Sequence, residues 1–84
     1  MTHHATHSFW SAYAALPKQT QKLADKAFQR LKDNPRHPSL QLKKVGQIWS
    51  ARISINCRAL AVEDGEGLVW IWIGDHAEYD KLLR

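Results

Sequence analysis

The sequence is poor in cysteine and contains no long apolar run. Its one cysteine, Cys57, excludes an internal disulfide bond and is typical of a reducing compartment. No apolar segment approaches the roughly 20 residues that a membrane-spanning helix needs. The polar, histidine-rich segment 1–7 does not resemble a signal peptide. We therefore expect a cytoplasmic protein with no membrane partner.

Length and aromatic content bound the architecture. The 84 residues allow one hydrophobic core, so we predict a single domain over residues 1–84. Four tryptophans supply large contact areas for so small a core.

Acidic residues are scarce in the first two thirds of the chain. Residues 1–58 carry ten Lys/Arg but only Asp25 and Asp33, a balance of +8, whereas residues 59–84 have a balance of −4. A basic surface of this kind suits a polyanion such as nucleic acid, or an acidic protein partner. The alternative is that the helical lysines only form a solvated face.

The N-terminal part is predicted to be helical. Segment 1–8 is a candidate edge strand, and apolar residues at helical spacing predict a helix over about 8–15 that ends or restarts at Pro17. A second helix ends at Asn34-Pro35, because the residue before proline disfavours helical dihedral angles. Its apolar stripe consists of Leu23, Ala24, Ala27, Phe28 and Leu31. We expect the two helices to form a hairpin that packs on a sheet.

Three strands and a short helix are predicted to follow. Apolar and polar residues alternate along segment 49–55, which is typical of a half-buried strand. Turns are expected at Asn56 and at segment 64–67. The continuous apolar run 68–73 predicts a strand that is buried on both faces. Asp75, with Glu78 three residues later, has the spacing of a helix N-cap.

Two arginines, Arg52 and Arg58, lie within this otherwise apolar sheet. A two-residue turn would place them on opposite faces, with Leu60 and Val62 on the core face, whereas a three-residue turn would place both on one face. Guanidinium groups bind phosphate oxygens with two parallel donors, so the pair predicts a phosphate site. The alternative is an ion pair with Glu63, Asp75 or Asp80.

Other chemistries have weaker support in the sequence. His3, His4 and His7 lie close together but lack acidic or cysteine partners at ligand spacing, so no metal site is predicted. Cys57 as a nucleophile would need a neighbouring base that the sequence does not indicate. No cofactor is expected.

The chain resembles the RelE/ParE superfamily of bacterial toxin–antitoxin toxins. The resemblance covers nearly the whole chain from Phe9 onward. The matching segments are Leu16-Pro17, Asn34 to Leu40, Lys43 to Val45, Trp49 to Ile53, Cys57 to Leu60 and Ile73 to Asp80. It implies an α+β fold, in which an N-terminal helical hairpin packs on a mostly antiparallel sheet of three to four strands with a short C-terminal helix.

The resemblance also implies a metal-independent endoribonuclease that cuts messenger RNA on the ribosome. Arg58 and Arg52 match the arginines that hold the scissile phosphate. Lys43 and Lys44 match phosphate-binding lysines. His76 and Tyr79 match C-terminal residues that act in proton transfer or base stacking. No acidic residue lies in segment 40–45, where some members carry a catalytic carboxylate.

Partners follow from the same resemblance. A toxin of this kind would bind a cognate antitoxin, the ribosome and messenger RNA, and would need no small-molecule cofactor. Two alternatives remain open: a ParE-like poison of DNA gyrase, and a degenerate member that binds its antitoxin or RNA without turnover.

Overall fold

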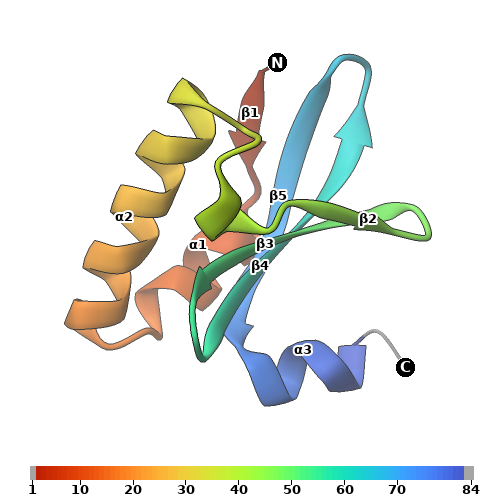
Figure 1. Ribbon diagram of the computed structural model, residues 1–84. Coiled ribbons are helices and arrows are strands. Elements are labelled where there is room, and N and C mark those ends of the chain that lie inside the picture. Colours follow the sequence, from red (N-terminus) through yellow and green to blue (C-terminus); the bar gives the residue numbers. More distant parts are fainter. Residues whose placement is uncertain (1, 83–84) are drawn as a thin grey trace.

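The computed structural model describes residues 2–82 and has an α+β fold (Figure 1). Its elements follow one another in this order: β1 (His3–Ala5), α1 (His7–Ala14), α2 (Lys18–Asp33), the 3₁₀ turn η1 (Pro38–Leu40), β2 (Lys43–Val45), β3 (Ile48–Ser54), β4 (Cys57–Asp64), β5 (Gly67–Asp75) and α3 (His76–Leu82).

The strands form one five-stranded sheet in the order β1-β5-β4-β3-β2. β1 runs parallel to β5, and the other neighbouring pairs are antiparallel. The predicted mostly antiparallel sheet with a short N-terminal edge strand is therefore confirmed. The sheet has one or two strands more than predicted, because Lys43–Val45 pairs with β3 and adds an edge strand.

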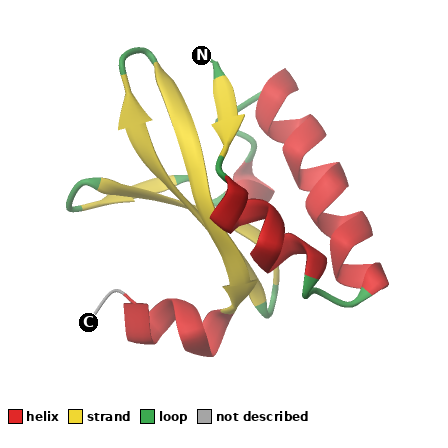
Figure 2. Ribbon diagram, turned by 180° about the vertical axis from the view of Figure 1, so that it is seen from behind, coloured by secondary structure: helices red, strands yellow, loops and turns green. Residues whose placement is uncertain are grey.

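α1 and α2 both lie on one side of the sheet, as predicted (Figure 2). α1 begins after Thr6, whose hydroxyl accepts a hydrogen bond from the Phe9 N–H at 3.2 Å. α2 begins directly after Pro17 and ends at Asp33, so its boundaries follow the predicted proline signals. Within residues 2–82 no helix is long and apolar enough to span a membrane.

The buried stripe of α2 is narrower than its apolar pattern suggested. Ala24, Ala27 and Leu31 are buried, but Leu23 and Phe28 are 43% and 42% exposed. Each of these two residues is adjacent in sequence to a buried alanine, so it is rotated by about 100° around the helix axis. A single helix on a sheet covers only a narrow stripe, and the two large side chains lie at its edges.

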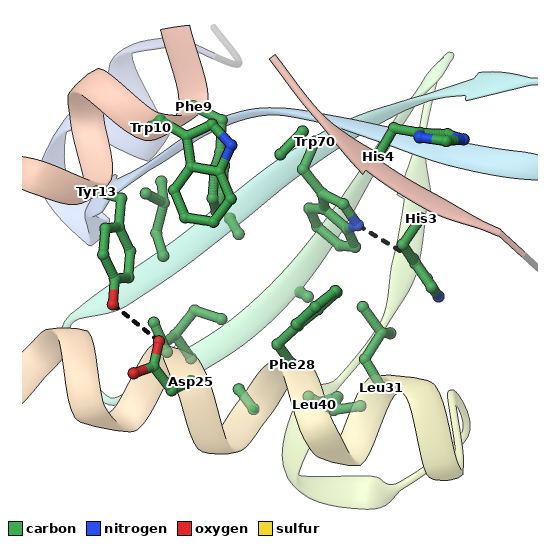
Figure 3. Close-up of a pocket in the computed structure, with 17 residues that line it drawn as sticks. His3, His4, Phe9, Trp10, Tyr13, Asp25, Phe28, Leu31, Leu40 and Trp70 are labelled. Carbon is green, nitrogen blue, oxygen red and sulfur yellow. Dashed lines mark hydrogen bonds between the residues drawn. The ribbon is translucent and has the colours of Figure 1, made fainter. Parts of the chain in front are cut away.

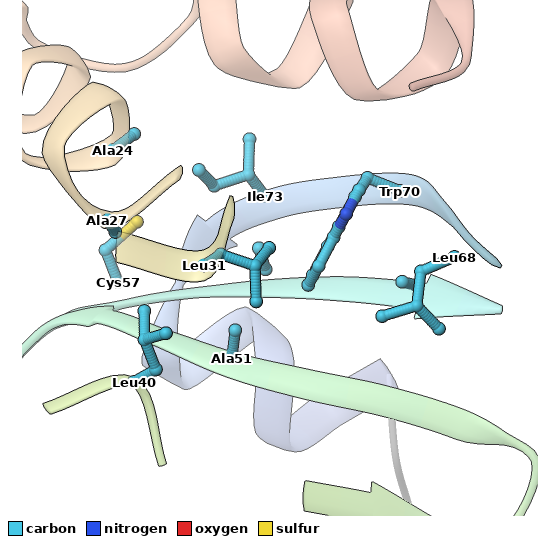
Figure 4. Packing of buried hydrophobic residues seen from close by; sticks show 11 residues of the cluster. Ala24, Ala27, Leu31, Leu40, Ala51, Cys57, Leu68, Trp70 and Ile73 are labelled. Carbon is cyan, nitrogen blue, oxygen red and sulfur yellow. The ribbon is translucent and has the colours of Figure 1, made fainter. Parts of the chain in front are cut away.

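The hydrophobic core lies between these helices and the sheet (Figure 4). Its buried members are Ala24, Ala27, Leu31, Leu40, Ala51, Cys57, Ala59, Ala61, Leu68, Trp70 and Ile73. The prediction that Leu60 and Val62 share the core face is wrong. Ala59 and Ala61 pair with the core side of β3, and Leu60 and Val62 therefore point to the opposite face of the sheet.

Alanines along this core face leave a cavity of about 330 Å³ between the helices and the sheet (Figure 3). Trp10 from α1, Phe28 from α2 and Trp70 from β5 line it. Beside the cavity, the Tyr13 hydroxyl donates a hydrogen bond to Asp25 Oδ1 at 2.8 Å, which joins α1 to α2. This bond raises the pKa of Tyr13, because ionisation of the phenol would break it.

Candidate functional site

The β3–β4 hairpin brings Arg52 and Arg58 together. Its loop is the two-residue turn, one of the two alternatives that the sequence left open, with Ser54 paired to Cys57. A β-bulge between Arg52 and Ser54 then shifts the register by one residue, and Arg52 pairs directly with Arg58. The chain thus combines a two-residue turn with the shared face that we had expected only from a three-residue turn.

Both arginines lie on the face of the sheet opposite α1 and α2. Directly paired residues in a sheet point to the same side, so the register defines the members of this surface. We call it the arginine face. Its members are Lys43, Ser50, Arg52, Arg58, Leu60, Trp72 and Gly74.

No carboxylate neutralises the two arginines within the described chain. Among residues 2–82 the ion pairs join Lys44 to Glu63 and His76 to Asp80, and neither involves Arg52 or Arg58. The alternative interpretation of the arginines as members of structural ion pairs is therefore not what the structure contains.

Arg58 instead has neutral neighbours. Its Nη2 donates a hydrogen bond to Gln41 Oε1 at 3.3 Å, and its guanidinium carbon lies 5.2 Å from the centre of the Tyr79 ring. Its Nη1 is buried without a hydrogen-bond partner in the described structure. An unsatisfied buried donor costs free energy, so an anion that reached this atom would supply the missing hydrogen-bond partner.

α3 places the remaining predicted residues at the end of this face. Asp75 Oδ1 accepts a hydrogen bond from the Ala77 N–H at 2.6 Å, which confirms Asp75 as the N-cap. The Tyr79 ring is 6% exposed and stacks on the His76 ring with 5.6 Å between centroids. Arg58, Tyr79 and His76 therefore form one continuous group. The His76 side chain remains 46% exposed, with Nε2 3.8 Å from Asp80 Oδ1.

The two predicted lysines point to opposite sides of the sheet. Lys43 pairs with Ser50 and lies on the arginine face. Lys44 pairs with Trp49 on the helix side, and its Nζ is 3.2 Å from Glu63 Oε1. The same oxygen accepts the Trp49 indole N–H at 2.7 Å, and this bond together with Lys44 lowers the pKa of Glu63. Lys44 is thus the one predicted site residue that the structure does not bring to the arginine face.

Two neighbours of the arginines escaped the sequence analysis. Gln41 contacts Arg58 from a left-handed backbone conformation with φ of 44°. Trp72 belongs to the run predicted to be buried on both faces. In the structure Leu68, Trp70 and Ile73 are buried, but Trp72 is half-buried, because α1 and α2 cover only the other face. Neither the Gln41 contact nor the exposure of Trp72 has a local sequence signal.

Cys57 is an unreactive core residue. It is 3% exposed, and burial raises the pKa of its thiol to about 11, helped by the nearby charge of Asp75. We predict that its alkylation by iodoacetamide at pH 8 is at least about 100-fold slower in the folded protein than in urea, because the thiolate is scarcer by that factor. Raising the pH towards 11 should speed the native reaction. Equal rates in both states would contradict this assignment.

The histidines near the N-terminus do not form a metal-binding group. Among the described residues no three His, Cys, Asp or Glu side chains are arranged to hold a metal ion. His3 Nδ1 instead accepts the Trp70 indole N–H at 3.2 Å, and burial is the main cause that lowers the pKa of His3.

Comparisons with known proteins identify the fold. No protein-family model and no curated protein matches the sequence. Solved structures do match. YafQ from E. coli strain BL21(DE3) superimposes with a TM-score of 0.74 at 10% identity, over 93% of this chain and 96% of that one.

Two further solved structures agree with this result. In the RelB–RelE antitoxin–toxin complex from Methanococcus jannaschii, the matching chain gives a TM-score of 0.70 at 13% identity, over 96% of this chain and 99% of that one. The YoeB/ParE toxin from Agrobacterium tumefaciens gives 0.67 at 19% identity, over 90% and 99%. The chain therefore has the fold of the RelE/ParE superfamily of toxins that its sequence resembles.

Proposed function

We propose that this chain is the toxin of a type II toxin–antitoxin system and cleaves messenger RNA on the ribosome. The observation that carries the proposal is the direct pairing of Arg52 with Arg58 on the sheet face that α1 and α2 do not cover, without a carboxylate partner in residues 2–82. Like charges placed opposite each other destabilise a sheet. A phosphate group bound between them would remove that repulsion, which supports a functional reason for the pair.

The arginine face suits cleavage by the RNA's own 2′-hydroxyl. The 2′-hydroxyl loses its proton to water as its oxygen attacks the adjacent phosphorus, and the bond from phosphorus to the 5′-oxygen of the next nucleotide breaks. The products are a 2′,3′-cyclic phosphate and a free 5′-hydroxyl. Negative charge grows on the phosphate oxygens during this step, and fixed guanidinium donors stabilise it. Arg58 contributes the unpartnered Nη1, and Arg52 lies directly across the strand pair.

In the group formed by Arg58, Tyr79 and His76, we assign proton transfer to His76, the exposed member. His76 retains 46% side-chain exposure and can reach a bound chain, and a protonated imidazole can donate an N–H proton to an oxygen atom. It would protonate the leaving 5′-oxygen. Tyr79 is too buried to meet substrate freely, so its role is to hold Arg58 and His76 in place. Lys43 would bind a neighbouring phosphate.

The proposed partners are the ribosome, messenger RNA and an antitoxin in the bacterial cytoplasm. Two similar solved structures are toxin–antitoxin complexes, RelB–RelE from M. jannaschii and RelBE2 from Mycobacterium tuberculosis. An acidic or disordered antitoxin segment would complement the positive balance of this chain and cover the arginine face.

Inducible expression in a bacterium tests the proposal. We expect growth arrest, a fall in protein synthesis, and new 5′-hydroxyl ends within translated messages, mapped by primer extension. Arrest with filamentation, an SOS response and intact messages would instead indicate the gyrase alternative. Growth without arrest would indicate a protein that binds without turnover, consistent with the missing carboxylate in segment 40–45.

A further inference from the structure

Trp72 differs from the other three tryptophans in how its ring is used. Trp49 and Trp70 each donate the indole N–H to another side chain, and Trp10 packs edge-on against two aromatic rings. Within the described residues Trp72 has neither an aromatic neighbour nor a hydrogen-bond partner for its N–H, and that nitrogen is not buried. The core does not account for so large a side chain at this position.

The sheet fixes Trp72 beside the arginines. It pairs with Leu60 on the arginine face, which makes Arg58 its diagonal neighbour across β4 and β5. Diagonal neighbours in an antiparallel pair are about 7–8 Å apart, within reach of aromatic and long side chains. The indole also covers Gly74, because a Cβ built on Gly74 would overlap the Trp72 ring. The ring therefore extends along the sheet surface towards the row that contains Arg58.

Glycine at position 74 makes this arrangement possible. Gly74 pairs with Arg58 and has an ordinary extended backbone, so its importance lies in the missing side chain and not in an unusual φ. Any other residue would push the indole away from the sheet. A half-buried aromatic ring is thus held next to a cationic group on the side that α1 and α2 leave open (Figure 2).

Two unsatisfied polar atoms lie on the same face. The Ser50 hydroxyl is fully buried without a partner, in the row that also contains Leu60 and Trp72. Arg58 Nη1 is the other. An apolar ring next to the Arg58 guanidinium, which has a donor without a partner, matches the two halves of a nucleotide, since a base offers a flat π-face and its phosphate offers acceptor oxygens.

We propose that Trp72 is a stacking platform for a nucleobase of the RNA strand whose phosphate is held by Arg52 and Arg58. This inference rests on the proposed function and adds the base-binding residue to it. Stacking alone accepts every base, because each has a π-face. Trp72 therefore contributes affinity and orientation of the strand, and selectivity among bases must come from other contacts.

The test measures binding of an uncleavable strand. The probe is a fluorescein-labelled hexanucleotide with 2′-O-methyl groups, which lacks the attacking hydroxyl, and binding is followed by anisotropy. Trp72→Leu should raise the dissociation constant of the hexanucleotide by about 5- to 150-fold, the usual effect of losing one base–aromatic stack. Trp72→Phe should give an intermediate value. Trp10→Leu, a change of an indole that is 54% exposed on α1, should leave binding unchanged.

An anion without a base distinguishes two roles of Trp72, stacking on a nucleobase and positioning of the arginines. Tripolyphosphate should compete for the arginines equally well in the wild type and in Trp72→Leu. If Trp72→Leu lowered the affinity for the hexanucleotide and for tripolyphosphate by the same factor, the function of Trp72 would be to position Arg58. The stacking role would then be wrong. Wild-type affinity of folded Trp72→Leu for the hexanucleotide would equally overturn it, while cleavage and toxicity of the wild type would still stand.

Gly74→Ala provides a second route if Trp72→Leu fails to fold. This change keeps the tryptophan but displaces its ring, so it should also weaken hexanucleotide binding and spare tripolyphosphate. Unchanged hexanucleotide binding by folded Gly74→Ala would overturn the proposal. A wild-type protein that bound neither probe would overturn the proposed function and the stacking role together.

Discussion

Arg58→Ala is expected to reduce messenger RNA cleavage by about 100-fold or more and to abolish growth arrest, while the domain stays folded. Removing one preorganised donor to a developing oxyanion typically has an effect of this size. Folding should survive, because Arg58 has no charged partner within residues 2–82 and makes one neutral hydrogen bond, to Gln41. Its removal also relieves the repulsion from Arg52. Cleavage on purified ribosomes and urea unfolding followed by circular dichroism measure the two halves of this prediction.

Two matched variants make the result specific. Arg58→Lys keeps the charge but loses the planar fork that binds two phosphate oxygens, so it should restore only part of the activity. Lys44→Ala removes one cation from the opposite face, where an exposed ion pair contributes little to stability, and should leave cleavage unchanged. Full activity of Arg58→Ala would remove this residue from the site. An unfolded Arg58→Ala protein would instead make it structural.

The helices were predictable because their boundaries have local causes. Pro17 and Asn34-Pro35 limit α2 through backbone geometry that any neighbouring sequence would obey. The side chains that α2 buries depend on the sheet beneath it, and no local pattern contains that information. Phe28 therefore looked like a core residue but remains 42% exposed beside the cavity (Figure 3).

The candidate site was harder to predict, because a one-residue shift reverses a strand's two faces. The alternation around Arg52 was visible in the sequence, but the bulge that pairs it with Arg58 has no glycine or proline to mark it. Lys43 and Lys44 were indistinguishable for the same reason. Their separation depends on the turn at Gly46, with φ of 64°, which sets the register of β2 against β3.

Trp70→Ala is expected to leave no cooperative unfolding transition. Trp70 is 5% exposed in the core between α2 and the sheet, and its N–H bonds to His3 in the edge strand β1 (Figure 4). Replacing a buried tryptophan by alanine costs roughly 3–5 kcal/mol, as much as the whole stability of a marginal small domain. The loss would also enlarge a cavity that Trp70 already lines. Urea titration followed by far-ultraviolet circular dichroism measures the effect.

Trp49→Ala is the comparison that tests this argument. Both tryptophans lie on the inner face of the sheet, but Trp49 is only half-buried at the edge of the core, with its N–H on the exposed carboxylate of Glu63. Its replacement should therefore lower the urea midpoint and keep a cooperative transition. Trp70→Phe retains one apolar ring and loses the bond to His3 together with part of the buried ring area, so it should be less stable than the wild type but still unfold cooperatively. If Trp70→Ala were as stable as Trp49→Ala, burial between the helices and the sheet would not be the source of this domain's stability.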